Sequence, residues 1–529
     1  MDELRRLAEM LQRGAISRRE FFGRTAALGA AGALNSAMPF AAEAAETVKK
    51  GGALRLGLDG ASDKDSLEPA SYADSVMIVV GRALYNSLVE LAADGTAKPE
   101  LAASWEAKDG AKTWIVNLRK GVRFSNGQEF TAEDALYSLN LHRGDSSSGA
   151  ARAMKAVVEV KKLDKYQIQI SLSAADADFI YVLTDARVMM APDGFKDWSK
   201  PVGTGGYLIE KFDPGVRVAL KKAPDYWRAG EGRGNLDAAE ITVTNDGAAR
   251  LNGLVSGQFD VINRVDPKAA ALLQKTPKIE IVRSPSGWFA VLAMEIDKPP
   301  YDNPDIRLAL KYAIDREQIL KAALSGYGAL GNDHPVPPGD PYFNKELPQR
   351  KHDSDRASFY FKRAGLADAK IVLQYSDAAF AGAADMAVLL QASAGKASIK
   401  IDLNKEPADG FWDNVWLKGP FVESYWAGAP AATQILSAAF RAGAPLNETH
   451  WSNDKFEKLL ADAKSETDEV KRKGYIWEMQ AMLRDDGGAV IPMFRDWIDA
   501  HRDNVGGHSP HGGLEMDNGY IVDKAFLRS

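Results

Sequence analysis

The sequence contains no cysteine and no long apolar run, and each absence excludes a class of proteins. Without cysteine there is no thiolate nucleophile, no cysteine-based metal site and no disulfide, so a chain of 529 residues must be stabilised by its core alone. No run beyond the N-terminal 44 residues reaches the roughly 18 apolar residues of a membrane span. The net charge is −6 and both signs are interspersed. We therefore expect a globular chain that has no nucleic-acid partner.

Enzyme signatures are also missing. The motifs G-x-S-x-G, H-E-x-x-H and G-x-x-x-x-G-K-[ST] do not occur. The glycine-rich segment 201–207 is followed by a strand-like run instead of a helix, so we interpret it as a link within the fold instead of a phosphate cradle. His508 and His511 lie close enough in sequence to help hold a metal, but we favour a solvated loop. We predict no catalytic residue, no metal and no cofactor, although sequence alone leaves a spatial Ser-His-Asp triad open.

The N-terminus has the parts of a secretory signal. Arg18–Arg19 precede a weakly apolar run over 25–34, and Ala42-Glu43-Ala44 is a cleavage site of the A-x-A type. The arginine pair resembles a twin-arginine (Tat) signal, and an ordinary amphipathic helix is the alternative. We predict a signal peptide over 1–44 and a periplasmic product. Because no cysteine is available for a lipid, we expect that product to be soluble and not anchored.

Short apolar alternations and helical patterns follow one another along the rest of the chain. Period-2 alternation predicts strands over 53–58, 113–119, 122–124, 156–161, 167–172, 208–212 and 216–220. Helices are predicted over 76–92, from 131, from 303 to 320, over 454–463 and over 470–484. We therefore expect an α/β fold.

The most unusual composition lies between residues 411 and 451. Four of the eleven tryptophans fall in this stretch, together with further aromatic residues and prolines. Ligand pockets are mostly apolar or aromatic and are formed by loops more often than by regular elements. We predict that at least two of these aromatic side chains line a binding cleft; the alternative is that they fill a core.

Several sequence blocks carry a family resemblance. They are 85–89 (YNSLV), 99–106 (PELAASWE), 113–127 (TWIVNLRKGVRFSNG), 201–205 (PVGTG), 224–227 (PDYW), 254–260 (LVSGQFD) and 305–316 (DIRLALKYAIDR). In order and spacing, the chain resembles family 5 of the extracellular solute-binding proteins, the peptide, nickel and opine receptors of ATP-binding-cassette importers. The resemblance covers nearly the whole chain after the signal.

The resemblance implies a two-lobed periplasmic-binding-protein fold (class II, large family 5 type) that closes on its ligand, with an extra subdomain in lobe I. On that pattern lobe I comprises 45–94, 201–307 and 498–529, the inserted subdomain is 95–200, and lobe II is 308–497. The crossings between the lobes, where hinge motion is absorbed, would lie near Arg307 and Asp496.

The resemblance also implies where the ligand binds. Peptide-binding members hold the ligand's ammonium with an aspartate in a loop that matches 425–433 here, where the tryptophan is present and the aspartate is absent. Because an unpaired buried ammonium is costly, either Glu423, Asp413 or Asp333 takes that role, or the ligand has no free amino terminus. The predicted ligand-binding residues are Trp412, Tyr425, Trp426 and Trp451 around the ligand, with Asp333, Glu423, Asn447 and Arg441 at its polar ends.

The predicted function is a monomeric periplasmic receptor that captures a peptide-like or opine-like solute and delivers it to an ABC permease. Such a receptor makes and breaks no covalent bond. It requires only a closed conformation that the bound ligand stabilises. One alternative is a secreted hydrolase that uses carboxylates such as Asp485 and Asp486, although neighbours on a helix point apart. Another is a chaperone-like or signalling receptor on the same fold.

Overall fold

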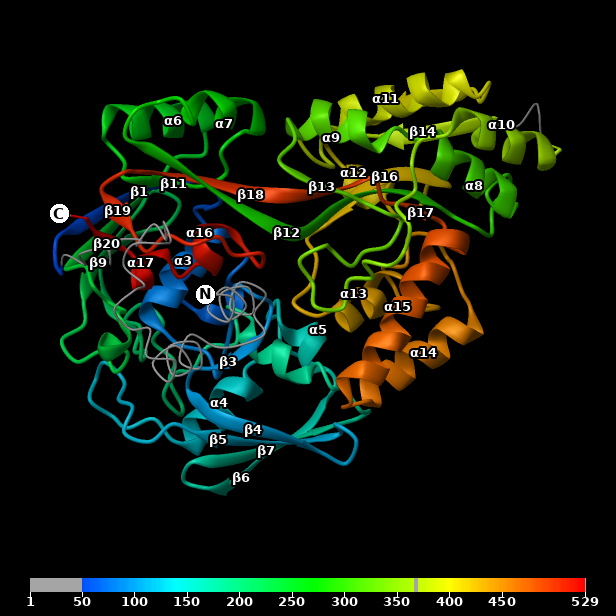
Figure 1. The fold of residues 1–529 in the computed structure, drawn as a ribbon. Coiled ribbons are helices and arrows are strands. Elements are labelled where there is room, and N and C mark those ends of the chain that lie inside the picture. Colours follow the sequence, from blue (N-terminus) through cyan, green and yellow to red (C-terminus); the bar gives the residue numbers. More distant parts are fainter. Residues whose placement is uncertain (1–49, 366–369, 529) are drawn as a thin grey trace, which may run out of the picture. The chain divides into compact units, whose positions relative to one another are not determined.

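The computed structural model describes residues 50–365 and 370–528, so the predicted signal peptide lies outside the described residues. A mixed β-sheet of twelve strands runs through two groups of helices (Figure 1). Its main path is β15 (Ile401–Lys405), β14 (Ile371–Tyr375), β16 (Phe421–Trp426), β12 (Ile279–Met294), β18 (Met493–Arg502), β11 (Val261–Ile262), β1 (Ala53–Leu58), β10 (Ala238–Val243), β9 (Arg217–Lys222) and β8 (Tyr207–Asp213), with β13 (Gly328–Leu330) on β18 and β17 (Ala489–Val490) on β12.

Two long antiparallel strands, β12 and β18, join the two parts of this sheet (Figure 1). The first half of β12 pairs with β18, and its second half pairs with β16. The register of β12 against β18 shifts between Pro285 and Phe289. The predicted domain boundaries and hinge positions near Arg307 and Asp496 stay predictions.

A separate antiparallel sheet forms from residues of the predicted inserted subdomain. Its order is β4 (Ala102–Lys108), β5 (Thr113–Leu118), β7 (Gln167–Leu172) and β6 (Val157–Asp164). Alternate residues of β5 and β7 are buried, because one face of this sheet packs on a hydrophobic core and the other meets solvent. Two small sheets pair β2 (Val89–Leu91) with β3 (Ala97–Pro99), and β19 (Val505–Gly506) with β20 (Phe526–Leu527).

Helices cover both parts of the large sheet. The α-helices are α3 (Ser75–Leu84), α4 (Ala132–Asn140), α5 (Ala151–Met154), α6 (Gly247–Ser256), α7 (Pro267–Leu273), α8 (Pro304–Ala313), α9 (Arg316–Leu324), α10 (Ser354–Arg363), α11 (Ala383–Lys396), α12 (Phe411–Asn414), α13 (Ala432–Ala439), α14 (Asp454–Ser465), α15 (Glu469–Asp486), α16 (Glu515–Asn518) and α17 (Ile521–Lys524). Three 3-10 turns are η1 (Pro69–Ser71), η2 (Phe179–Thr184) and η3 (Ala229–Glu231). No helix in the described part of the chain combines the length and apolarity needed to cross a membrane.

Most of the predicted elements are confirmed, and two helices are not as predicted. The helix predicted over 76–92 ends at Leu84, where the glycine-rich segment 201–207 packs on its last turn. A Cβ on Gly203 would lie 2.1 Å from the Leu84 carbonyl oxygen, so only glycine allows this approach. The helix predicted from 303 to 320 is two helices, because Asp315 caps the second by accepting a hydrogen bond from the Gln318 amide. The 122–124 strand is reduced to a single bridge at Arg123.

Candidate functional site: a cleft lined by separate parts of the chain

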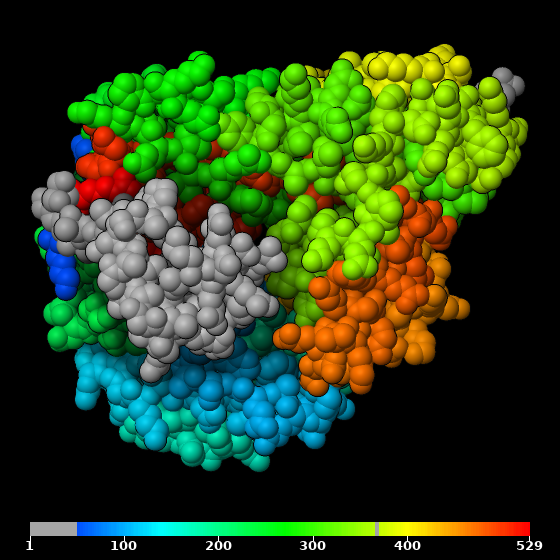
Figure 2. Space-filling model, viewed as in Figure 1, coloured from blue at the N-terminus to red at the C-terminus, as the bar shows by residue number. Residues whose placement is uncertain are grey.

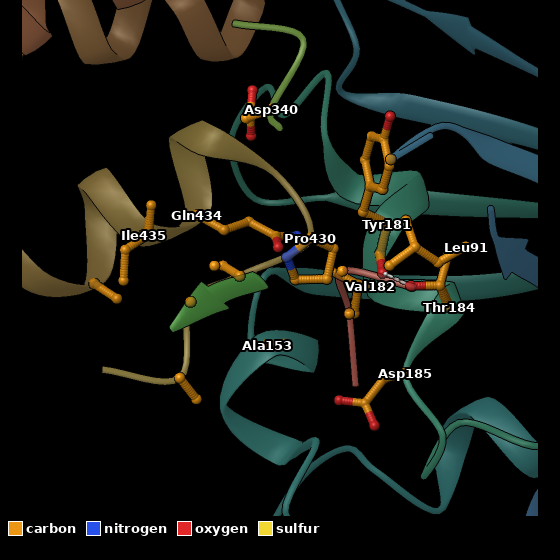
Figure 3. Close-up of a pocket in the computed structure, with 18 of the residues that line it drawn as sticks. Leu91, Ala153, Tyr181, Val182, Thr184, Asp185, Asp340, Pro430, Gln434 and Ile435 are labelled. Atoms are coloured by element: carbon orange, nitrogen blue, oxygen red, sulfur yellow. Dashed lines mark hydrogen bonds between the residues drawn. The ribbon is translucent and has the colours of Figure 1, made fainter. Parts of the chain in front are cut away.

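A cavity with a volume of about 1480 Å³ lies in the described part of the chain. One wall comes from α3, α5 and the segment 174–187, and the other comes from the loops 337–341 and 426–430 with α13 and α14. Residues 285–287 of β12 and the tail segment 510–514 also line it. Figure 2 shows the orange segment that contains α14 and α15 beside the cyan and teal inserted region. Figure 3 shows side chains from both walls, including Tyr181 from η2 and Gln434 from α13.

Alanines form much of the cavity lining. They are Ala73, Ala92, Ala93, Ala150, Ala153, Ala156, Ala174, Ala175, Ala186, Ala329, Ala427, Ala429, Ala438, Ala444 and Ala461. Their short side chains leave space that larger residues would fill. The cavity exceeds the roughly 300–1,000 Å³ of ordinary small-molecule pockets. It therefore has room for a solute larger than a single amino acid.

The two walls touch each other through charged residues. Asp176 pairs with Lys464 of α14 at 2.9 Å, and the Ala177 amide donates to the Lys464 carbonyl at 2.7 Å. The neighbouring carboxylate of Asp178, which is 1% exposed, accepts hydrogen bonds from Arg472 of α15 and from the Thr433 hydroxyl of α13. We call the contacts of Asp178 with Arg472 and Thr433 the latch. The latch and the Asp176 pair therefore join the segment 174–187 to α13, α14 and α15.

The cavity contains both paired and unpaired charges. Asp185 pairs with Arg187 within one wall, and Asp496 pairs with Arg283. Arg152 and Arg441 line the cavity and form no ion pair or side-chain hydrogen bond with another described residue. Both guanidinium groups are therefore available to an anionic part of a ligand.

Two unpaired carboxylates also line the cavity. Asp340 accepts a hydrogen bond from the Tyr342 amide at 2.7 Å, and Glu457 accepts one from the Ala442 amide at 2.8 Å. Neither forms an ion pair with a described residue. Burial raises the pKa of Asp340 to about 6, because a desolvated carboxylate is harder to ionise.

Two of the eight predicted ligand-binding residues, Trp426 and Arg441, line the cavity. The Trp426 indole donates to Glu448 at 2.8 Å, which fixes the orientation of its ring at the cavity wall. Successive side chains of a strand point to opposite faces, so Tyr425 points away from Trp426. The Tyr425 ring stacks on Trp288 at 5.5 Å and meets Trp412 edge-on at 5.6 Å.

The other predicted residues do not line this cavity. Asp333 is fully buried and pairs with Arg316 at 2.6 Å and with Arg350 at 3.1 Å, and these cations lower its pKa despite the burial. Trp451 donates to Asp486 at 2.9 Å, and the Asn447 amide donates to the Trp451 carbonyl at 2.8 Å. These contacts hold loops and helices together within the fold. A ligand-binding role for these residues stays a prediction.

Glu423 is a special case among them. It is buried in β16, and neither of its carboxylate oxygens has a hydrogen-bond partner. Burial raises its pKa well above the usual range, because a desolvated carboxylate is harder to ionise. Asp413, the remaining alternative for holding an ammonium, is exposed on α12 and does not line the cavity.

Sequence reasoning missed the segments 174–187 and 337–341. The segment 337–341 could have been found in the sequence, because Pro337-Pro338-Gly339-Asp340-Pro341 is typical of a rigid loop and carries one carboxylate. The first has no such signal, because its cavity residues are alanines mixed with common polar residues. The lining alanines of α5 and α13 likewise carry no sequence signal of a place in the cavity wall.

The two histidines and the two adjacent aspartates are held in separate contacts within the fold. The interpretation of His508 and His511 as a solvated loop is wrong, since both imidazoles are buried; the Nε2 atom of His511 lies 2.9 Å from the Leu91 carbonyl oxygen. Asp485 pairs with Arg350 at 3.1 Å, and Asp486 pairs with Arg307 at 2.8 Å, so each is bound to a different arginine.

Outside the cavity, one cluster of possible metal ligands occurs among the described residues. Ligand atoms of Glu295, Asp297 and His450 lie within 4.8 Å of one another. The His450 ring contacts Asp297 at 3.0 Å, and Lys298 lies 3.7 Å from Glu295. The prediction that the protein holds no metal stays a prediction.

The comparison with protein families decides the assignment. Residues 96–445 match the model described as "Bacterial extracellular solute-binding proteins, family 5 Middle", which is more than half of the chain. The chain belongs to this family. The resemblance, the two-lobed fold and the role as a solute-binding receptor are thereby confirmed.

Individual relatives are similar over most of their length. A glutathione-binding protein, GsiB of Salmonella choleraesuis, is 26% identical over 494 residues, which cover 88% of this chain and 93% of the relative. The solved structure of DppA from Helicobacter pylori with the peptide STSA has a TM-score of 0.73 at 21% identity and covers 91% of this chain and 99% of its own. AgaA from A. tumefaciens R10 with agropinic acid has a TM-score of 0.73 at 22% identity, covering 90% and 99%. The names and titles of these relatives describe binding proteins.

Proposed function

We propose that this solute-binding protein captures a peptide-like or opine-like solute in the cavity and delivers it to the permease of an ABC importer. The observation that carries the proposal is the cavity itself, about 1480 Å³ in volume, with walls from separate parts of the chain. A ligand that touches both walls favours the closed state by its differential contacts. The relatives support a peptide-like or opine-like class, since their names and titles state glutathione, the peptide STSA and agropinic acid.

The protein acts outside the cytoplasmic membrane, as a soluble periplasmic monomer without a lipid anchor, after export directed by Arg18–Arg19. It catalyses no reaction and binds no nucleic acid. In support, the cavity has no nucleophile paired with a base, and the adjacent aspartates Asp485 and Asp486 are held by separate arginines.

A thermal-shift and fluorescence screen tests the capture. The purified protein is mixed with glutathione, with the peptide STSA and with agropinic acid, and the melting temperature and tryptophan emission are recorded. A ligand present at 100 times its dissociation constant stabilises the folded state by about 2.7 kcal/mol, a shift that such a screen resolves. Because Trp426 lies at the cavity wall, we expect its emission to change with binding.

Uptake tests the delivery. A deletion strain should lose uptake of the same labelled solute without losing any extracellular hydrolysis. If no member of the three ligand classes shifts the melting temperature and mass spectrometry finds no co-purifying solute, the proposed function is wrong.

A further inference from the structure

Five carboxylates line the cavity, and they differ in what they pair with. Asp176, Asp185 and Asp496 each pair with a basic side chain of the protein itself. Their charges are neutralised before a ligand arrives. Only Asp340 and Glu457 among the five have no ion pair with a described residue.

Asp340 is held on a rigid loop. Three prolines, Pro337, Pro338 and Pro341, restrict the backbone of this loop, and the Tyr342 amide donates to one oxygen of the carboxylate at 2.7 Å. The other oxygen has no hydrogen bond from a described residue. Figure 3 shows this carboxylate at the cavity, together with Gln434 from α13 and Tyr181 from η2.

The surroundings of Asp340 make it unfavourable as a lone anion. Its pKa is raised to about 6 chiefly by burial, and the nearby Asp178 raises it further, while Arg472 and the Tyr342 amide lower it. Burial raises the pKa of Tyr181 to about 12, and the nearby carboxylates of Asp178 and Asp340 raise it further. A desolvated charge of this kind gains most from a charged hydrogen-bond partner. Among the described residues, no basic side chain forms an ion pair or a hydrogen bond with Asp340.

We propose that Asp340 binds a positively charged group of the solute, an ammonium or a guanidinium, inside the cavity. This inference rests on the proposed function and names the residue that selects the charge of the ligand. The two unpaired arginines, Arg152 and Arg441, are then available to a carboxylate of the same solute. The recognised class is a zwitterionic solute with separated charges.

The test uses two pools of glutathione and of di- to tetrapeptides that contain no lysine or arginine. In one pool the amino termini are free; in the other they are acetylated, so the pools differ only in the ammonium. The full-length protein is incubated with each pool and filtered, and the retained solutes are quantified by mass spectrometry. The variants are Asp340→Asn, which keeps an oxygen for the Tyr342 amide, and Glu457→Gln, which removes the other unpaired carboxylate as a matched control.

We expect the wild-type protein to retain at least tenfold more solute from the free-amine pool than from the acetylated pool. Asp340→Asn should lose this preference with an unchanged melting temperature, and Glu457→Gln should keep it. Asp340→Glu should recover part of it. Because a cation favours the ionised carboxylate, wild-type retention should fall between pH 7 and pH 5, and Asp340→Asn should show no such fall.

Equal retention from both pools, or an intact preference in Asp340→Asn, overturns the assignment of Asp340 while leaving the receptor function in place. Equal losses of preference in Asp340→Asn and Glu457→Gln also overturn the assignment. The preference for a free amine would then arise from the overall negative charge of the cavity and not from Asp340 itself. If the wild-type protein retains nothing from either pool, a peptide ligand is excluded, and the assignment of Asp340 is rejected together with the peptide part of the proposed function.

Discussion

The latch between the two walls of the cavity should govern how easily the protein opens. Asp178 and Arg472 are both almost completely buried, and the carboxylate also accepts the Thr433 hydroxyl. They meet only when the segment 174–187 lies against α13 and α15. When the walls separate, water solvates both charges. The latch therefore stabilises the closed state and not the fold of either part.

The Asp178→Asn variant leaves the Arg472 guanidinium buried without its counter-ion. Breaking a buried ion pair by removing one partner costs about 3–5 kcal/mol where the other charge stays buried. Opening releases this cost, and the Asp176–Lys464 pair still holds the walls at 2.9 Å. We therefore expect the opening equilibrium to shift by about 1–3 kcal/mol, which is roughly a five- to hundredfold larger open fraction.

Hydrogen–deuterium exchange of the ligand-free protein measures this shift directly. Amides that the contact protects, such as Ala177, which donates to the Lys464 carbonyl, should exchange five- to hundredfold faster in Asp178→Asn. The dissociation constant of any bound solute should rise by a similar factor. The free energy of global unfolding in urea should fall by no more than the same amount, about 1–3 kcal/mol, because the cost disappears once the walls part.

A matched control is the Asp462→Asn variant on α14. Asp462 pairs with Lys458 at 2.7 Å on the exposed surface, where a salt bridge contributes only about 0–1 kcal/mol. Exchange at Ala177 should be the same in this variant as in the wild type. Unchanged exchange in Asp178→Asn, or an equal effect of both variants, would refute the latch.

Three further predictions concern stability. Asp333→Ala should lower the free energy of unfolding by about 3–5 kcal/mol, measured in urea, because two buried arginines lose their shared carboxylate; a loss under 1 kcal/mol would contradict this. Gly428→Ala should lower the melting temperature and weaken solute retention, because Gly428 has φ +85° and a Cβ would lie 2.6 Å from Gly287 carbonyl atoms; wild-type behaviour would show that the loop can move. Burial lowers the pKa of His334 to about 4, so between pH 6.5 and pH 4 the unfolded chain binds the proton more readily and the stability from the neutral ring is lost, by up to about 1.4 kcal/mol per pH unit. His334→Leu should remove this pH dependence in urea titrations, and a difference between variant and wild type that is constant with pH would disprove it.

The sequence was sufficient to predict the helices and strands whose residues follow a clear local pattern. Alternation over 113–118 and 167–172 gave the paired strands of the inserted region, and Thr131 with Asp134 gave the start of α4, where the carboxylate accepts the Thr131 amide at 2.7 Å. Errors occurred where a distant segment ends an element. The end of α3 at Leu84 depends on glycines more than a hundred residues away, and no local pattern records that contact.

The cavity could be only partly predicted, for two physical reasons. The aromatic stretch predicted that at least two of its aromatic side chains line the cleft, but of those side chains only Trp426 lines this cavity; residues 427–430 of the same stretch line it as well. The composition of this stretch did not indicate which face of β16 lines the cavity. Trp426 and Tyr425 are neighbours on the strand and therefore point to opposite faces: Trp426 lines the cavity, and Tyr425 stacks on Trp288. The second reason is that alanine forms much of the lining, and in a sequence alanine looks like ordinary helix or loop.

A cavity made of small side chains has a consequence for how it selects a solute. Alanine methyl groups provide space and apolar surface, but they cannot distinguish one polar solute from another, since recognition of a charged group requires a placed partner. Recognition of the charged ends of a solute therefore requires charged groups that the fold leaves without an ion pair, and we assign Asp340 to the positive group and Arg152 and Arg441 to the negative group. Burial raises the pKa of Asp340 to about 6, so its ionised carboxylate is costly to keep in the cavity without a cation beside it. A solute without a positive group leaves that cost in place on closure, which is the physical basis for excluding it.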